Sequence, residues 1–263
     1  MPTIQKELEK LVSNTAYSAY EAKLEKEVLA EETPRHLAII MDGNRRFAQE
    51  MGLSSGSGHE EGKRKLEEVF DWCQRAGIRV LTVYAFSTEN FQRSGDEVEL
   101  LMEMFEESFY TLAEEDRVHK NRIRVMVLGD RELLPQSVQE AIDTVEEATK
   151  DYDSYIYNIA IAYGGRQEIV YALKQVAQKV KDGEMEVEEI DEDAISDHMY
   201  TSHVPDPDLV LRTSGEVRVS NFLLWQMAYS ELYFTDIYWP GFRYIDFLRA
   251  IRSYQQRRRR YGE

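Results

Sequence analysis

The sequence has few cysteines, no long apolar run and a shortage of basic residues. Its single cysteine, Cys73, cannot form a disulfide within the chain, which fits a reducing compartment. No apolar stretch approaches the roughly 20 residues that span a bilayer, and residues 1–17 are too charged for a signal peptide. Because 49 acidic residues outnumber 32 basic ones, the net charge of −17 argues against nucleic acid as a partner. We therefore expect a cytoplasmic protein that binds no nucleic acid.

Familiar phosphate-binding signatures are also missing. The chain has neither a GxxxxGK[ST] loop nor a GxGxxG pattern, which excludes the usual nucleotide-binding motifs. It has no Asp-Asp pair and so no DDxxD motif, the magnesium-binding hallmark of the all-helical trans-prenyl synthases. A phosphate or diphosphate site in this chain must therefore use other residues on another fold.

Short apolar segments alternate with helical patterns along most of the chain. We expect strands at 36–41, 79–86, 122–129, 155–163, 208–212 and 231–238, and helices near 59–76, 96–117, 132–149, 166–182, 190–200, 218–229 and 243–258. Near-continuous apolar strands separated by helices are typical of a mostly parallel sheet covered on both faces. The sequence thus predicts an acidic helical segment at 1–33, ended by Pro34, and a single α/β domain at 34–263.

The first expected strand is followed by DGNRR, which puts a carboxylate, a glycine, an amide and two guanidinium groups at one strand end. In open α/β sheets, ligands bind beyond the carboxyl ends of the strands. Arginines and the N–H groups of a following helix suit an anion. Asp42 would be useful beside an anion if a divalent cation such as magnesium lay between them. The alternative is an ordinary strand-to-helix turn with Asp42 as the helix cap.

The second expected strand ends in STENFQR, where Ser87 and its polar neighbours could simply cap the next helix. However, Asn90, Phe91 and Arg93 add an amide, an aromatic ring and a guanidinium group at the same sheet edge. This mixture suits a diphosphate attached to an apolar chain. His59, between GSG and EEG, could lie near this site, although a lone histidine is more often structural.

The fifth expected strand ends at Arg212, and Arg218 and Ser220 follow at the expected start of an apolar helix. Two arginines and a hydroxyl near a helix N-terminus indicate a second anion site. Glu231 is a carboxylate inside an otherwise apolar segment. A buried charge there needs either an ion-pair partner or a metal ion.

Several long blocks of the sequence, taken together, resemble the cis-prenyltransferases. These blocks are HLAIIMDGNRRFA, GHEEG, LTVYAFSTENF, NIAIAYGGRQEI, DLVLRTSGEVRVSNFLLWQMAYSELYF and WPGF, in order from about residue 34 onward. The resemblance implies a dimeric α/β fold with a hydrophobic tunnel beside the sheet. It also implies a reaction that joins an allylic prenyl diphosphate to isopentenyl diphosphate and makes a cis double bond at each addition.

The resemblance also assigns roles to individual residues. It implies that Asp42 binds Mg²⁺ and that Ser87 and Asn90 are catalytic, linked to removal of the isopentenyl proton, although the base itself is open. The allylic diphosphate site would contain Gly43, Asn44, Arg45, Arg46, Phe47, His59, Thr88, Glu89, Phe91 and Arg93. The isopentenyl diphosphate site would contain Arg212, Arg218, Val219, Ser220, Arg260 and Gly262. Glu231 would reach the metal from the partner subunit of a homodimer.

Four positions depart from the family pattern. Ser55 stands where relatives usually have arginine, Phe91 where they have tryptophan, Ser214 turns the common TGGE into TSGE, and Val217 replaces a histidine of many bacterial members. The retained DGN and RVSN elements favour a catalytic chain making a polyprenyl diphosphate, with peripheral membrane contact during product release. The alternatives are prenyl transfer to an unusual acceptor and a non-catalytic subunit of a heteromeric enzyme.

Overall fold

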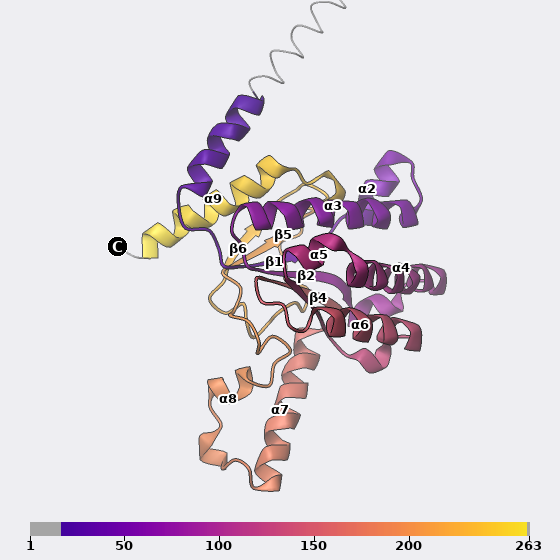
Figure 1. Cartoon of the computed structure of the whole chain (residues 1–263), viewed down its shortest axis with the longest axis vertical. Coiled ribbons are helices and arrows are strands. Elements are labelled where there is room, and N and C mark those ends of the chain that lie inside the picture. The colour runs from indigo at the N-terminus through magenta and orange to yellow at the C-terminus, as the bar shows by residue number, and fades with distance from the viewer. Residues whose placement is uncertain (1–16, 262–263) are drawn as a thin grey trace, which may run out of the picture.

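The fold is built on one parallel sheet. The computed structural model describes residues 17–261, with side chains as far as Arg258 (Figure 1). The strands stand in the order β3-β4-β2-β1-β5-β6, and each neighbouring pair is parallel. Their bounds are β1 His36–Ile40, β2 Val80–Ser87, β3 Ile123–Leu128, β4 Tyr155–Tyr163, β5 Leu209–Arg212 and β6 Glu231–Phe234. The predicted α/β class with a parallel sheet is confirmed.

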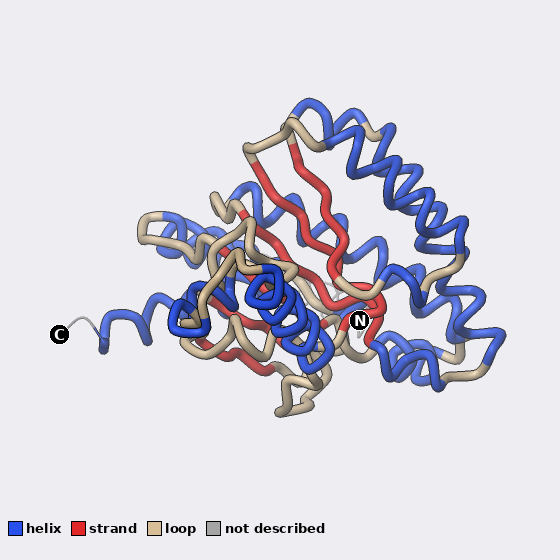
Figure 2. Tube along the Cα trace, turned by 90° about the horizontal axis from the view of Figure 1, so that it is seen from below, coloured by secondary structure: helices blue, strands red, loops and turns tan. Residues whose placement is uncertain are grey.

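Helices lie on both sides of the strands (Figure 2). Residues 17–29 are helical, and the later helices are α2 Asn44–Met51, α3 Ser55–Arg75, α4 Gly95–Glu114, α5 Asp116–Lys120, α6 Gln136–Thr149, α7 Gly165–Asp182, α8 Glu192–Ser196 and α9 Tyr244–Tyr261. A short 3₁₀ helix, η1 Thr88–Gln92, follows β2. None of the helices in this described part of the chain is long and apolar enough to cross a membrane.

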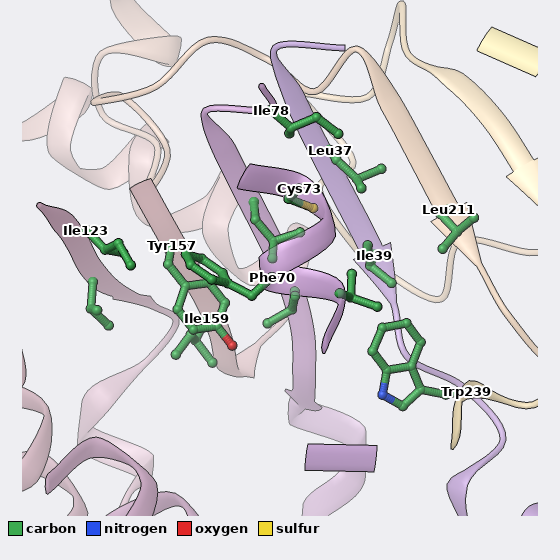
Figure 3. Close-up of a cluster of buried hydrophobic side chains, with 14 of the residues drawn as sticks. Leu37, Ile39, Phe70, Cys73, Ile78, Ile123, Tyr157, Ile159, Leu211 and Trp239 are labelled. Carbon is green, nitrogen blue, oxygen red and sulfur yellow. The ribbon is translucent and has the colours of Figure 1, made fainter. Parts of the chain in front are cut away.

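Alternate residues of the strands pack against two different layers, as expected for a pleated sheet. Leu37 and Ile39 of β1 join the larger core with Phe70 and Cys73 of α3 (Figure 3). Ala38 of β1 belongs to a smaller cluster on the other face, where other strand residues pack with Phe222 and Leu223. Both faces of the sheet are therefore buried, which explains why the strands are apolar without alternation.

The N-terminal helical residues belong to the same packed unit as the sheet. Leu24 and Val28 are each 1% exposed and lie in the larger core. Gln255 of α9 donates from Nε2 to the carbonyl of Val28 at 2.9 Å, and Tyr244 donates to Glu25 at 2.9 Å. This segment therefore covers α9 and contributes to the core of the domain.

One predicted helix is wrong. Residues 218–229 form a series of turns, and Ser220, Asn221 and Leu223 have positive φ angles of 47°, 63° and 41°. A right-handed helix requires negative φ at every residue. The side chains of Phe222 and Leu223 are fully buried against the sheet, so tertiary packing determines the conformation of this apolar segment.

Other boundaries differ by smaller amounts. The helix expected near 190–200 is reduced to α8, and the one near 96–117 is divided into α4 and α5. The strand expected at 231–238 ends at Phe234. The helix expected from 59 begins at Ser55, with the hydroxyl of Ser54 accepting from the N–H of Ser57. This N-cap satisfies an N–H that would otherwise lack a partner at the helix start.

Candidate active site

The polar segments after β1, β2 and β5 meet at one edge of the sheet. Ile40, the last residue of β1, pairs with Tyr84 of β2 and with Arg212 of β5. Asp42, which follows β1, and Ser87, the last residue of β2, therefore lie at the same carboxyl edge. This is the edge at which open α/β sheets bind ligands.

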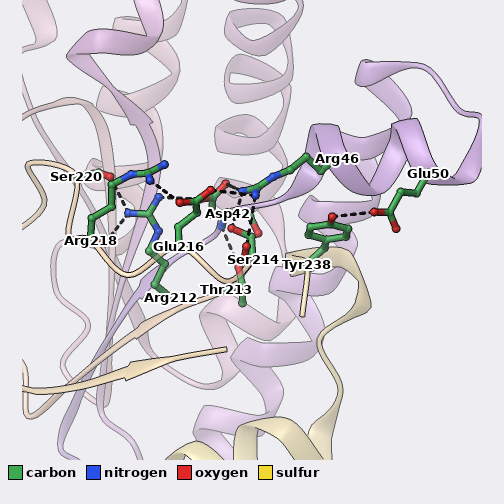
Figure 4. A network of polar contacts seen from close by, with 10 residues as sticks. All are labelled: Asp42, Arg46, Glu50, Arg212, Thr213, Ser214, Glu216, Arg218, Ser220 and Tyr238. Atoms are coloured by element: carbon green, nitrogen blue, oxygen red, sulfur yellow. Dashed lines mark hydrogen bonds and ion pairs between the residues drawn. The ribbon is translucent and has the colours of Figure 1, made fainter. Parts of the chain in front are cut away.

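Asp42 lies between two guanidinium groups at this edge (Figure 4). Its Oδ2 accepts from Nη2 of Arg212 at 2.7 Å, and its Oδ1 accepts from Nη2 of Arg46 at 3.0 Å. Thr213, fully buried, fixes the backbone of Asp42 by donating to its carbonyl at 2.6 Å and accepting from its N–H at 3.0 Å. Side chain and backbone of Asp42 are thus both held from the end of β5.

The charge state of Asp42 follows from these contacts. Its partial burial would by itself raise the pKa, because a carboxylate loses hydration. Hydrogen bonds from Arg212 and Ser214, together with the charges of Arg212 and Arg46, outweigh burial and hold the pKa of Asp42 below its usual value. The side chain is therefore an anion at neutral pH and is able to bind a cation.

Gly43 directs the chain from β1 into α2. Its φ of 109° lies in a region that side chains with a Cβ rarely adopt, and an added Cβ would stand 2.8 Å from Cδ1 of Tyr238. The turn brings Arg46 back over Asp42, where its guanidinium also lies over the ring of Tyr238 at 5.5 Å. Glycine is thus required at position 43, because a larger residue would collide with Tyr238, which follows β6.

A second carboxylate, Glu216, contacts two of the arginines. Its Oε1 accepts from Nη1 of Arg46 at 3.2 Å, and its Oε2 accepts from Nη1 of Arg218. Arg46 also donates to the hydroxyl of Ser214 at 2.7 Å. Ser214 has φ of 79°, a conformation that the family's usual glycine adopts more readily. Its hydroxyl nevertheless adds a contact to Arg46 that glycine could not make.

Arg218 and Ser220 do not begin a helix, so the predicted helix N-terminus at this anion site is wrong. They lie in a turn segment where Arg212 donates from Nη1 to the Ser220 hydroxyl at 2.7 Å and to the carbonyl of Arg218 at 2.5 Å. Val219 precedes Ser220 and accepts through its carbonyl from the N–H of Phe222. Arg212 and side chains of the turn itself, without a helix, form this part of the site.

Two further residues hold the turn segment in place. Tyr84 donates its hydroxyl to the carbonyls of Tyr163 at 3.1 Å and Ser220 at 3.3 Å. Asn221 accepts from the N–H of Arg166 at 2.9 Å and donates to Glu89 at 3.1 Å. Because Ser220 and Asn221 have left-handed backbone conformations, these contacts offset the strain of the turn.

Three of the residues predicted for the allylic site converge on Glu97, in the first turn of α4. Arg93 donates to its Oε1 at 2.9 Å, His59 contacts the same oxygen at 3.4 Å, and Arg45 lies 3.5 Å from Oε2. Although burial raises the pKa of Glu97, the nearby Arg93 and Arg45 lower it more, so its pKa lies below the usual value. Burial is the main reason why the pKa of His59 is also lowered.

Ser87 and Asn90 cap a helix, which was the alternative to a catalytic role for these residues. Asn90 accepts through Oδ1 from the N–H of Ser87 at 3.0 Å, and the two form a capping box at the start of η1. Thr88 accepts from Gln167 at 3.3 Å. Phe91 packs edge-on against Phe86 with ring centroids 4.8 Å apart. The capping box keeps the polar side chains of Ser87 and Asn90 at the ligand-binding edge.

An apolar cavity of about 150 Å³ begins beside these polar groups and runs between α3 and α4. Met41, Asn44 and His59 line it near the carboxyl edge, and Ile123 and Tyr157 line it near the opposite ends of β3 and β4. The Asn44 Oδ1 atom is buried without a hydrogen-bond partner. A cavity of this size accommodates a molecule like benzene. It extends along the sheet from the carboxyl edge toward the amino ends of β3 and β4.

Glu231 does not join Asp42 within one chain. It pairs with Leu209 at the start of β5, whereas Asp42 follows the strand ends. The salt-bridge alternative is present, because Glu231 accepts from Nη1 of Arg257 at 2.9 Å. The side chain of Arg260 and the whole of Gly262, both predicted for the isopentenyl site, lie outside the described residues.

The remaining positions of interest lie around the site. Phe47, half-buried, forms the first α2 backbone hydrogen bond to Gly43. Ser55 is exposed beside Arg45, Arg93 and Glu97. Val217 is 77% exposed, so its replacement of histidine leaves an apolar side chain in solvent at this edge.

Sequence reasoning missed Glu97, Glu216, Tyr84 and Asn221. Glu216 and Asn221 lie inside the block that carried the resemblance, so closer attention to TSGEVRVSN could have found them. Glu97 is one of many acidic residues on an amphipathic helix, and no local signal distinguishes it. In the described part of the chain, no three His, Cys, Asp or Glu side chains gather as a metal-binding group.

Comparison with known proteins shows which sequences and structures this chain resembles. Residues 40–262 match the prenyltransferase family model described as undecaprenyl diphosphate synthase. The chain is 53% identical over 253 residues, 96% of both chains, to a geranylgeranyl-diphosphate-specific tritrans,polycis-undecaprenyl-diphosphate synthase of Pyrococcus abyssi. It is 51% identical over 251 residues, 95% of this chain and 97% of the relative, to the enzyme of the same name from Thermoplasma acidophilum.

Two solved structures share the fold. Lavandulyl diphosphate synthase from Lavandula x intermedia, in complex with dimethylallyl diphosphate, is 35% identical with a TM-score of 0.79, over 85% of this chain and 95% of that one. A Campylobacter jejuni protein described as a probable undecaprenyl diphosphate synthase is 32% identical with a TM-score of 0.71, over 89% of this chain and all of that one.

Proposed function

Since the chain belongs to the undecaprenyl diphosphate synthase family of prenyltransferases, we propose that it condenses isopentenyl diphosphate with an allylic prenyl diphosphate to form a cis-polyprenyl diphosphate. The observation that carries this proposal is the position of Asp42 between two arginines, next in sequence to Met41, which lines the apolar cavity. The charged groups suit two diphosphates, and the cavity suits a growing apolar chain.

The allylic diphosphate binds at α2 in this proposal. Arg46 and the free N–H groups in the first turn of α2 supply donors for phosphate oxygens. Arg45, Arg93 and His59 surround the same region and are oriented by Glu97. These groups stabilise the negative charge that develops on the departing diphosphate.

Isopentenyl diphosphate binds at the turn segment after β5. Arg212, Arg218 and Ser220 supply its donors, and Val219 lies beside them. Holding both substrates at adjacent strand ends makes the bond-forming step effectively intramolecular, an effect worth up to about 7–11 kcal/mol. Ser87 and Asn90 lie at the same edge and are the residues that we assign to handling the proton lost from the isopentenyl group.

The cofactor that we propose is Mg²⁺, held by Asp42 together with substrate oxygens. Magnesium commonly takes one or two protein carboxylates and completes its shell with phosphates and water. The donor set fits, because Asp42 is an anion at the sheet edge and its lowered pKa keeps it ionised. When bound, the ion would neutralise charge on the diphosphate that leaves.

Two relatives support the primer that we propose. The Pyrococcus and Thermoplasma relatives are specific for geranylgeranyl diphosphate, and we propose the same four-unit primer for this chain. A space that accommodates benzene is smaller than this primer, and we propose that α3 and α4 move apart as the chain enters. The apolar walls shelter the developing allylic cation from water.

The experiment is incubation of the purified protein with radiolabelled isopentenyl diphosphate and allylic primers of different length, followed by chromatographic sizing of the products. We expect long cis products, the fastest reaction with geranylgeranyl diphosphate, and no reaction after chelation of divalent cations. Failure to incorporate label with any primer would contradict the proposal.

We also propose that the active enzyme is a homodimer in which Glu231 serves the active site of the other subunit. The supporting observation is that Glu231 and Asp42 lie at opposite ends of the strands in one chain. Mixed dimers of Asp42→Asn and Glu231→Gln chains provide the test. One of the two sites would then be intact, so mixing should restore activity that neither variant has alone. No recovery on mixing would contradict the assignment.

The location that we propose is the cytoplasm, with peripheral membrane contact when the apolar product leaves. The support is chemical, because a long polyprenyl chain partitions into a bilayer. Flotation with lipid vesicles, in the presence and absence of product, would test the contact.

A further inference from the structure

Five charged side chains are linked by contacts of alternating charge in the candidate site, with Arg212 and Arg218 side by side at one end (Figure 4). In order they are Arg212, Asp42, Arg46, Glu216 and Arg218, and each is within ion-pair distance of the next. The two ends of this series, Arg212 and Arg218, belong to the proposed isopentenyl site, and Arg46 in its middle belongs to the proposed allylic site. Asp42 has a proposed role in metal binding, whereas Glu216 has none in the chemistry.

Glu216 uses both of its carboxylate oxygens, one for each region. Oε1 accepts from Arg46 at 3.2 Å, and Oε2 accepts from Arg218. Arg46 belongs to the proposed allylic site, and Arg218 belongs to the proposed isopentenyl site. The Glu216 side chain is 32% exposed, so it can move into solvent without rearrangement of the core.

A diphosphate that binds Arg46 or Arg218 through Nη1 competes with Glu216 for that nitrogen. If the allylic diphosphate displaces Glu216 from Arg46, the remaining contact to Arg218 is a single exposed ion pair between residues two apart in sequence. Such pairs contribute little. Arg218 then becomes available to the second diphosphate. The argument is symmetric, because displacement from Arg218 also weakens the contact to Arg46.

We propose that Glu216 is a positioning residue that couples the two substrate sites, in addition to the proposed condensation on which this inference rests. The first substrate to bind bears the free-energy cost of displacing Glu216, and the second does not. Each substrate therefore raises the affinity of the other by the same factor, as thermodynamic linkage requires. Two partly exposed ion pairs correspond to a factor of about three to ten.

The test measures binding without turnover. The affinity for isopentenyl diphosphate is determined by calorimetry with and without a saturating, unreactive thiolodiphosphate analogue of the allylic primer. We compare the wild-type protein with Glu216→Gln, which keeps the shape and removes the charge. In the variant, each ligand alone should bind about three to ten times more tightly than in the wild type. The coupling factor between the ligands should fall by the same ratio.

Glu50→Gln is the matched control. Glu50 lies on α2 at the end of the same network and accepts from Tyr238 at 2.8 Å, next to Arg46 but not in a bridge between arginines. The Glu50→Gln substitution removes the same charge as Glu216→Gln but breaks no bridge between arginines. We therefore expect this variant to show the wild-type coupling factor. Equal effects of both variants would mean that only net charge matters, and would overturn the inference. Glu216→Ala provides a second variant for the same measurement.

Four further outcomes are decisive. If both ligands bind and Glu216→Gln leaves the coupling factor unchanged, the inference is wrong while the proposed function stands. If the wild-type protein binds neither ligand, the proposed function itself fails. The titrations are repeated with a chelator. A change in coupling that persists there supports the ion-pair explanation, whereas one seen only with magnesium would make Glu216 a metal ligand and overturn it.

Discussion

Replacement of Asp42 by asparagine should separate the electrostatic role of this residue in folding from its role in the reaction. The side chain of Arg212 is 4% exposed and that of Asp42 is 26% exposed, with 2.7 Å between Nη2 and Oδ2. In the variant, the nearly buried Arg212 keeps two neutral acceptors, the Ser220 hydroxyl and the Arg218 carbonyl. The guanidinium group of Arg212 thus loses its anionic partner and keeps only neutral hydrogen-bond acceptors.

The expected loss of stability follows from that geometry. Removing one partner of a fully buried ion pair costs about 3–5 kcal/mol. Because Asp42 is partly exposed and water can replace some of its contacts, we expect a smaller loss of about 1–3 kcal/mol in the free energy of unfolding. The protein should remain folded, while turnover should fall at least about 100-fold, as with other groups that stabilise transition-state charge.

The assay is urea denaturation followed by the fluorescence of the three tryptophans, in wild type and variant at several pH values. The pKa of Asp42 in the folded protein lies below the ordinary 3.8. The ionised side chain therefore stabilises the folded state fully above the ordinary pKa, and this stabilisation is lost as the pH falls through the lowered value. The stability difference between the two proteins should be constant from neutral pH to about 5 and shrink below about 4.

Asp143→Asn is the control, because Asp143 pairs with Arg131 on the surface of α6 and is 74% exposed. Such a change should cost less than about 1 kcal/mol. The reasoning is refuted if Asp42→Asn destabilises no more than this control, or if its effect does not diminish in acid.

Three other substitutions test the surroundings of the site. Tyr84→Phe removes the hydroxyl that holds the carbonyl of Ser220. The KM for isopentenyl diphosphate should therefore rise several-fold, which corresponds to the loss of about one hydrogen bond, while the KM for the primer stays unchanged. Gly62→Ala would place a Cβ 2.7 Å from Oδ1 of Asn44, so the KM for the primer should rise and that for isopentenyl diphosphate should not. Ser55→Arg adds a guanidinium group beside the proposed allylic site and should lower the primer KM by up to about tenfold; an unchanged value would mean that the natural serine is neutral.

The sequence by itself determined the sheet and the place of the site. Apolar runs such as HLAII and LTVYAF end abruptly in polar residues, and this local change marks each strand end. Parallel strands bring those ends to one edge. Asp42, Ser87 and Arg212 could therefore be expected together without knowledge of any contact between them.

The turn segment 218–229 could not be predicted in the same way. Its mostly apolar run FLLWQMA has the composition of a helix, but Phe222 stacks on Tyr84 with ring centroids 4.6 Å apart. The Tyr84 hydroxyl donates to the carbonyl of Ser220, and the carbonyl of Asn221 accepts from the N–H of Gly165, which holds these two residues in left-handed conformations. Packing against the sheet overrides the local helical preference here.

Only the tertiary structure decided which carboxylates accompany the arginines. The sequence shows Arg46 and His59 as candidates, but not that Glu216, 170 residues from Arg46, and Glu97, 38 residues from His59, are their partners. With 49 acidic residues in the chain, composition cannot select among them. Ion pairing depends on distances of a few ångströms between side chains, and those distances are set by the packing of helices and turns on the sheet.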